Sequence, residues 1–150
     1  MKRIMLYLLI LVLAWIIPTE RVDIAQLRPV EVIAIYKNGD TVVMATDTED
    51  MGVGSSAAAA LENMRSTSPA IIYLDTAEYL LVEVSAQTEA ETIRQELKKS
   101  VRICGIEGTI DLKSAAEYLP VHGDLPSVSD WNRGEYLPLL HVENDRLKIS

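Results

Sequence analysis

The stretch VEVIAIYKNGDTVVMAT, residues 30–46, decides how the fold begins. Two runs rich in Val, Ile, Tyr and Thr flank Asn38-Gly39, and such runs favour strands. Asn-Gly is a strong short-range hairpin signal, because a type I′ turn needs positive φ at both central residues. The sequence therefore predicts a β-hairpin, with the folded domain starting at Pro29.

The chain that follows alternates between helical and strand patterns. A helix is predicted over residues 57–65, capped by Ser55 or Ser56, since a serine hydroxyl accepts free N–H groups of the first turn. Strands are predicted over residues 70–74 and 79–84. The second strand is apolar at nearly every position, which is typical of a central strand covered on both faces.

Two more helices are expected further along the chain. Residues 88–91, Thr-Glu-Ala-Glu, form a capping-box pattern that predicts a helix to about Ser100. A strand is predicted over residues 101–106. Asp111 is expected to cap a further helix, which Pro120 should end because proline lacks the N–H that a helix interior needs.

A second hairpin is predicted at the end of the domain. It covers residues 136–149, with a turn at 143–145, and follows a loop rich in Pro, Gly, Asp and Ser at 120–134. We therefore predict a mixed α/β (α+β) domain over residues 29–150. It has a single mixed β-sheet, about three helices, and N- and C-terminal β-hairpins.

The N-terminal segment predicts that the chain is exported or anchored in a membrane. Lys2 and Arg3 precede an uncharged apolar run, Ile4–Ile17, and a basic tip before such a run is typical of a signal sequence or an N-terminal membrane anchor. We assign this role to residues 1–18 and a polar connector to residues 19–28.

The apolar run is shorter than the roughly 20 residues of a full transmembrane helix. No small-x-small cleavage site follows it, and no cysteine there can accept a lipid. We therefore favour an uncleaved anchor over a cleaved signal, with a buried core helix as the third interpretation. The anchor residues are Ile4, Leu8, Leu11 and Trp15.

Charge predicts the orientation and excludes some partners. The chain has 22 Asp and Glu against 14 Lys and Arg, a formal net charge of −8. Because positive residues near an apolar segment tend to stay in the cytoplasm, the bulk of the chain is predicted to be extracytoplasmic, at the cell membrane or secreted. Its acidity argues against nucleic acid as a partner and against attraction to anionic lipid.

The loop at residues 47–56 is the candidate ligand site. Asp47, Glu49 and Asp50 could bind a divalent cation, but their spacing does not match an EF-hand. Gly52, Gly54 and Ser55 precede a helix and could cradle a phosphate, although no lysine is present and the carboxylates would repel an anion. We favour a solvated acidic loop followed by a helix cap.

The residue types that usually carry catalysis are scarce. Cys104 is the one cysteine, so no intrachain disulfide can form, and its apolar neighbours predict a buried thiol. His122 and His141 lack a neighbouring ligand pattern, which makes zinc unexpected. We therefore predict no catalytic residue, no cofactor and no metal, and the sequence leaves the roles of these three residues open.

Three aromatic residues lie near the Pro-rich loop: Tyr118, Trp131 and Tyr136. They could form a contact patch for a protein or a glycan. They could equally cover the core beneath a long loop, and we favour this second interpretation.

Several short stretches of the sequence, taken in their order along the chain, carry a resemblance to a known family. They are Val32–Asp40, Gly52–Gly54, Ala59–Met64, Glu78–Val82, Leu137–Leu139 and Asp145–Ile149. This order resembles the N-terminal domain of the Ger(x)C family of spore-germination proteins, across most of residues 23–150. The resemblance implies an extracytoplasmic, non-enzymatic α/β domain that assists a membrane-embedded germinant-receptor complex. Family members are lipoproteins with further domains, whereas this chain lacks the acceptor cysteine and ends at Ser150, so we expect a shortened relative or a protein that shares only the fold.

Together these features predict a membrane-tethered or exported binding and accessory module that is not an enzyme. The membrane, through the N-terminal segment, and a protein at that membrane are the expected partners. One alternative is an exported enzyme, or a metal- or ligand-binding domain, that uses the loop at 47–56. Another is a structural envelope protein that works by self-association.

Overall fold

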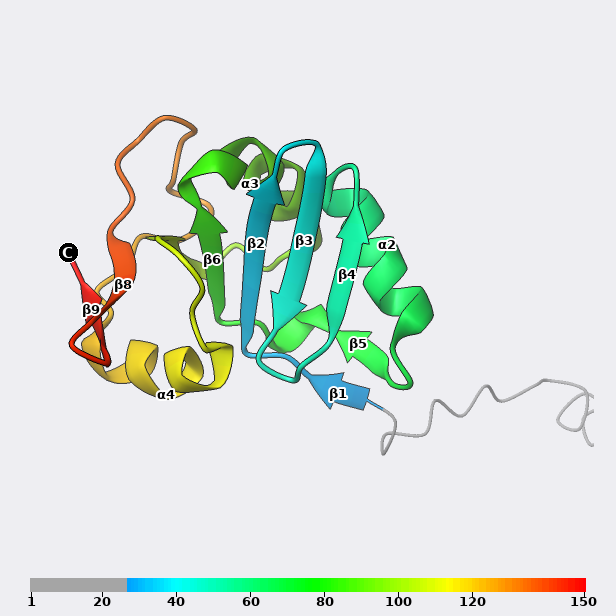
Figure 1. The fold of residues 1–150 in the computed structure, drawn as a ribbon, viewed down its shortest axis with the longest axis horizontal. Coiled ribbons are helices and arrows are strands. Elements are labelled where there is room, and N and C mark those ends of the chain that lie inside the picture. The colour runs from blue at the N-terminus through cyan, green and yellow to red at the C-terminus, as the bar shows by residue number, and fades with distance from the viewer. Residues whose placement is uncertain (1–26) are drawn as a thin grey trace, which may run out of the picture.

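The computed structural model describes residues 27–150 (Figure 1). A seven-stranded mixed sheet has the order β4-β3-β2-β6-β7-β8-β9, and β1 and β5 form a separate parallel pair. The strands are β1 (Leu27–Pro29), β2 (Val32–Asn38), β3 (Thr41–Thr46), β4 (Met51–Gly54), β5 (Ile71–Tyr73), β6 (Tyr79–Glu83), β7 (Arg102–Ile106), β8 (Leu139–Glu143) and β9 (Arg146–Ile149). The helices are α2 (Ala57–Thr67), α3 (Gln87–Ile93) and α4 (Leu112–His122). The predicted α+β class is confirmed.

The N-terminal hairpin forms as predicted, but with a different turn. β2 and β3 pair antiparallel up to Asn38 and Thr41, so Gly39 and Asp40 make the turn. Of these two, only Gly39 has positive φ, at 60°. This is the pattern of a type II′ turn, in which glycine occupies the first central position.

Parallel pairing of β2, β6 and β7 forms the centre of the sheet. Residues 32–35 and 79–82 are buried, as the apolar strand pattern predicted. Alternate side chains of these strands enter two separate cores. One core packs against α2 and α3 and the other against α4, so helices cover the centre of the sheet on both faces.

The predicted loop at residues 47–56 is wrong in its second half, because Met51–Gly54 forms β4 at one edge of the sheet. Gly52 and Gly54 lie against α2, and a Cβ on either would overlap the helix backbone at Ala60. These glycines let a strand and a helix approach closely. From the sequence alone they resemble the glycines of a flexible turn.

The predicted connector is wrong at its end. Residues 27–29 form β1, which pairs in parallel with β5 as Leu27 with Ile71 and Pro29 with Tyr73. The predicted strand at 70–74 therefore joins this small sheet and not the main one. Three residues are too few to show a periodic pattern, so the pairing of distant segments decides the structure here.

Two of the predicted helix starts are confirmed. The side chains of Ser56 and Asp111 accept backbone N–H groups at the first turns of α2 and α4. Pro120 does not end α4, which continues through it to His122. A proline in the last turn removes one hydrogen bond from a helix end that already lacks several partners, so the helix tolerates it.

The predicted capping box is wrong. α3 starts after Ala86 without a side-chain cap, and Thr88 lies within the helix. The helix is also shorter than the predicted limit near Ser100, because it passes into a 3-10 turn after Ile93. The side chain of Glu89 contacts another element, where its carboxylate accepts the N–H of Ala57 in α2 at 3.0 Å.

The C-terminal hairpin of β8 and β9 is confirmed. Asn144 and Asp145 have φ of 52° and 58°, the two positive values of a type I′ turn. β9 is the last strand of the sheet order. Figure 1 shows this hairpin on the left of the molecule, away from β1 and β5.

Candidate functional site

The carboxylates of the predicted ligand loop are engaged by the protein itself. Asp50 is almost fully buried and accepts hydrogen bonds from Ser68 at 2.8 Å, Thr48 at 2.8 Å and Arg28 at 3.2 Å. Burial alone would raise the pKa of Asp50, but these three donors outweigh it and hold the pKa below its usual value. Asp50 therefore joins β1, the loop and the end of α2.

The other loop residues point in separate directions. Asp47 accepts the backbone N–H groups of Glu31 and Val32, each at 3.1 Å. Glu49 is exposed and forms an ion pair with Lys113 of α4, and the hydrogen bond from Lys113 lowers the pKa of Glu49. The three carboxylates thus do not converge on one point.

The glycines and the serine of this loop do not form a phosphate cradle either. Gly52 and Gly54 lie in β4, and Ser55 lies between that strand and the true cap, Ser56. Across residues 27–150, no group of three or more His, Cys, Asp or Glu side chains is positioned to hold a metal ion. The structure gives the loop a role in holding the fold.

Cys104 and the two histidines lie in different environments. Cys104 is buried in the core, where burial raises the pKa of its thiol to about 12. The ring of His122 stacks on Tyr118, with centroids 4.2 Å apart, and His141 lies in β8. The prediction of a buried thiol is confirmed.

The three aromatic residues do not form one patch. Trp131 is 2% exposed and belongs to the core on the α2 and α3 side. Tyr118 packs against the other core, while Tyr136 is 75% exposed. Trp131 therefore covers the core as predicted.

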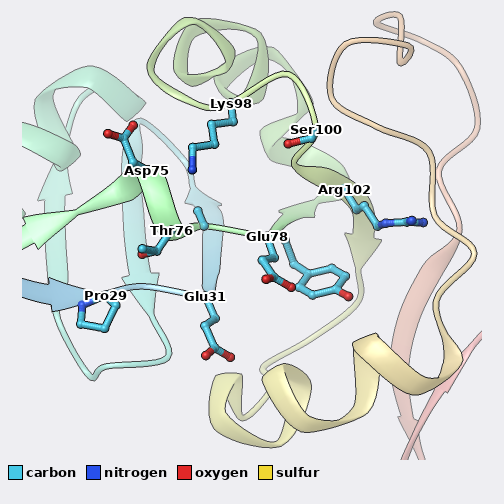
Figure 2. A pocket seen from close by; sticks show the side chains of 10 residues that line it. Pro29, Glu31, Asp75, Thr76, Glu78, Lys98, Ser100 and Arg102 are labelled. Atoms are coloured by element: carbon cyan, nitrogen blue, oxygen red, sulfur yellow. The ribbon is translucent and has the colours of Figure 1, made fainter.

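A polar cleft of about 520 Å³ opens at the amino ends of the parallel strands. Its lining residues are Pro29, Glu31, Asp75, Thr76, Ala77, Glu78, Tyr79, Lys98, Ser100 and Arg102. Figure 2 shows the ammonium group of Lys98 reaching into the opening near Asp75 and Thr76, while Arg102 points away from it. Burial raises the pKa of Tyr79, and the nearby Glu78 adds to this shift.

Several residues that line this cleft form hydrogen bonds that stabilise the fold. The Thr76 hydroxyl accepts the N–H of Val30 at 2.9 Å and lies 3.0 Å from the Val30 carbonyl oxygen, which joins the turn to β1. Arg102 donates to the Leu125 carbonyl at 3.3 Å. The cleft lies at the amino ends of the strands, whereas open α/β sheets usually bind ligands at the carboxyl ends.

The carboxyl ends of the strands have a smaller hollow of about 380 Å³. It is lined by Val84, Gln87, Gly105, Gly134, Glu135, Tyr136, Leu137 and Leu139. Glu135 accepts two hydrogen bonds from Asn132, which lower the pKa of its carboxyl group. These bonds hold the carboxylate in a local turn.

A groove of about 520 Å³ runs between α4 and the C-terminal hairpin. Its lining residues are Asp111, Ser114, Glu117, Tyr118, Val142, Asp145, Arg146 and Leu147. Val142 is 52% exposed, and Tyr118 and Leu147 are partly exposed. We call this surface, with its apolar side chains and acidic residues, the hairpin groove.

Sequence reasoning did not find the hairpin groove. The alternation at residues 146–149 indicated one exposed face of the last strand, but nothing local showed that α4 would lie beside it. The predicted anchor residues Ile4, Leu8, Leu11 and Trp15 lie outside the described residues. Within the described part of the chain, each helix is too short or too polar to cross a bilayer.

Comparisons with protein-family models, with curated proteins and with solved structures find no match to this chain.

Proposed function

We propose that the chain is a membrane-tethered accessory domain that binds a protein partner outside the membrane and catalyses no reaction. Residues 1–18 hold it at the bilayer, and the hairpin groove binds the partner. In this proposal the partner belongs to a membrane-embedded complex, of the germinant-receptor kind that the resemblance to the Ger(x)C family implies.

The hairpin groove is the observation that carries this proposal. Its apolar side chains, Tyr118, Val142 and Leu147, are exposed to different degrees. An apolar surface bordered by polar groups is typical of a protein contact.

The charges beside the groove indicate the character of the partner segment. Asp111, Glu117 and Asp145 line it together with a single cation, Arg146. A segment with apolar anchors flanked by Lys or Arg would complement this lining. Such complementarity mainly improves specificity and the rate of association.

The two alternative functions have less support. In the loop at 47–56, Asp47, Glu49 and Asp50 each bond to another part of the protein, which leaves little of the loop for a substrate or metal. Self-association through β9 is opposed by the charged residues Arg146 and Lys148, because charges on an edge strand disfavour pairing with a second copy.

Binding of a synthetic peptide tests this proposal. The probe is a peptide with leucine anchors and lysine flanks, and its control has the lysines replaced by glutamates. Val142→Lys introduces a positive charge at an exposed site in the groove, where it would repel the lysine flanks of the peptide. Val121→Lys is the matched control, because Val121 is also exposed but does not line the groove.

We expect the lysine peptide to bind the full chain and the Val121→Lys variant, and to lose most of its affinity for Val142→Lys. Equal binding to both variants, or equal binding of the two peptides, would contradict the assignment. Light scattering of the full chain in detergent tests the alternative of self-association, since an oligomer that Val142→Lys dissociates would favour it.

A further inference from the structure

The small sheet of β1 and β5 exposes an apolar face. Parallel pairing brings Leu27 beside Ile71 and Pro29 beside Tyr73, and residues paired across two strands share a face. Ile71 and Tyr73 are 44% and 40% exposed, Pro29 is exposed, and Leu27 is partly exposed. This set of four, which we call the β1–β5 face, contains no charged side chain.

The alternate residues of the same strands turn inward. Ile72 is buried in the core, and Arg28 bonds to the carboxylate of Asp50 at 3.2 Å. The small sheet is therefore fixed to the domain on its inner side. Its apolar outer face is left without a covering element among residues 27–150.

The β1–β5 face also lies where the chain enters the domain. Residues 19–26 separate the predicted anchor from β1, and they extend at most about 30 Å when fully stretched. The proposed tether would therefore keep this face close to the bilayer. The C-terminal hairpin, which lines the hairpin groove, lies on the other side of the molecule (Figure 1).

We propose that the β1–β5 face rests on the outer surface of the membrane, with Ile71 and Tyr73 among the headgroups of zwitterionic lipid. This inference rests on the proposed tether, which supplies the proximity. Tyrosine and aliphatic side chains suit the interface between lipid and water. The nearby Asp75 and Glu31 give no attraction to anionic lipid, so the contact is apolar. It directs the hairpin groove away from the membrane, towards its partner.

Site-specific fluorescence on the full chain tests this contact. The chain is reconstituted into phosphatidylcholine vesicles with an environment-sensitive thiol dye on Tyr73→Cys, on Ile71→Cys or, as the distal control, on Val142→Cys. The native Cys104 is buried, and burial raises its pKa to about 12, so we expect the dye to label the introduced cysteines in preference to it. Lipids that carry a nitroxide quencher report contact with the bilayer itself.

We expect the dyes at positions 71 and 73 to shift their emission to the blue and to be quenched by the nitroxide lipid, and the dye at 142 to stay in water. Vesicle-bound chain whose dyes at 71 and 73 stay in water overturns this inference alone. A blue shift without lipid quenching does the same, because a second protein copy would then cover the face. Chain that does not bind vesicles at all overturns the tether together with the contact.

Discussion

Both hairpins of this domain join their strands through a two-residue turn, but they differ in burial and in the strands that lie beside them. Residues 32–35 of β2 are fully buried, and β6 extends the sheet beside them. β8 and β9 are mostly exposed or partly exposed, and among residues 27–150 no further strand lies beside β9. Turn chemistry therefore forms a hairpin, while the neighbouring elements decide whether its side chains are buried in the core or exposed at the surface.

The largest expected effect is a loss of stability when a buried side chain of the first hairpin is shortened, compared with a partly exposed side chain of the second. Ile35→Ala in β2 removes a fully buried side chain and should lower the free energy of unfolding by about 2–5 kcal/mol. Leu147→Ala in β9 should cost clearly less, because Leu147 is partly exposed. Urea unfolding of the full chain in detergent, followed by circular dichroism, compares the two variants. Equal losses would contradict the distinction.

Asp50 supports the N-terminal hairpin region, and the C-terminal hairpin has no equivalent among the described residues. Asp50→Asn should lower the free energy of unfolding by about 1–3 kcal/mol, since it disturbs a buried set of hydrogen bonds. The Asp75→Asn variant, which changes an exposed carboxyl group, is the control.

The same variant predicts a pH dependence. The pKa of Asp50 is lower in the folded state than its unfolded value of about 3.9. Its stabilisation is therefore complete above that unfolded value and is lost as the pH falls through the folded one. Urea unfolding at several pH values should show a smaller acid-induced loss in Asp50→Asn than in the wild type. Parallel pH profiles would contradict this role.

Substitutions in the two hairpin turns should change the free energy of unfolding in opposite directions. Gly39→Ala should cost about 1–2 kcal/mol, because Gly39 has φ of 60°, a conformation that alanine disfavours. Asp145→Gly should instead stabilise by about 0.5–1 kcal/mol, since Asp145 already holds φ of 58°. Thermal or urea unfolding gives both signs, and a destabilised Asp145→Gly would argue against the positive φ.

The smallest effect concerns the exposed ion pair of the C-terminal hairpin. Glu143 and Lys148 are both about half exposed, and exposed pairs contribute about 0–1 kcal/mol. Glu143→Gln should therefore change the free energy of unfolding only slightly, in either high or low salt. A large loss in urea unfolding would show that this hairpin is less exposed than the structure indicates.

The parts of the fold that depend on residues close together in the sequence were predictable. The N-terminal hairpin, the Ser56 and Asp111 caps and the apolar run of β6 each depend on residues a few positions apart. Glu89 shows where this reasoning fails, because its carboxylate caps α2 from another helix. That contact depends on packing, which a local capping-box pattern cannot reveal.

The candidate site was less predictable than the fold. Gly52 and Gly54 looked like a ligand loop, and only the position of α2 shows that they permit close packing. The hairpin groove joins Tyr118 of α4 to Val142 of β8, so it exists only once the chain is folded. Sequence periodicity can mark an exposed face but cannot identify the element that lies beside it.

The proposed function requires that a bilayer separates the first residues from the folded domain. Labelling of intact cells with a membrane-impermeant maleimide tests it, with single cysteines introduced as Lys2→Cys and, on the exposed side of α2, Glu62→Cys. We expect position 62 to be labelled in intact cells and position 2 only after the membrane is permeabilised. Labelling of position 62 only after permeabilisation would contradict it.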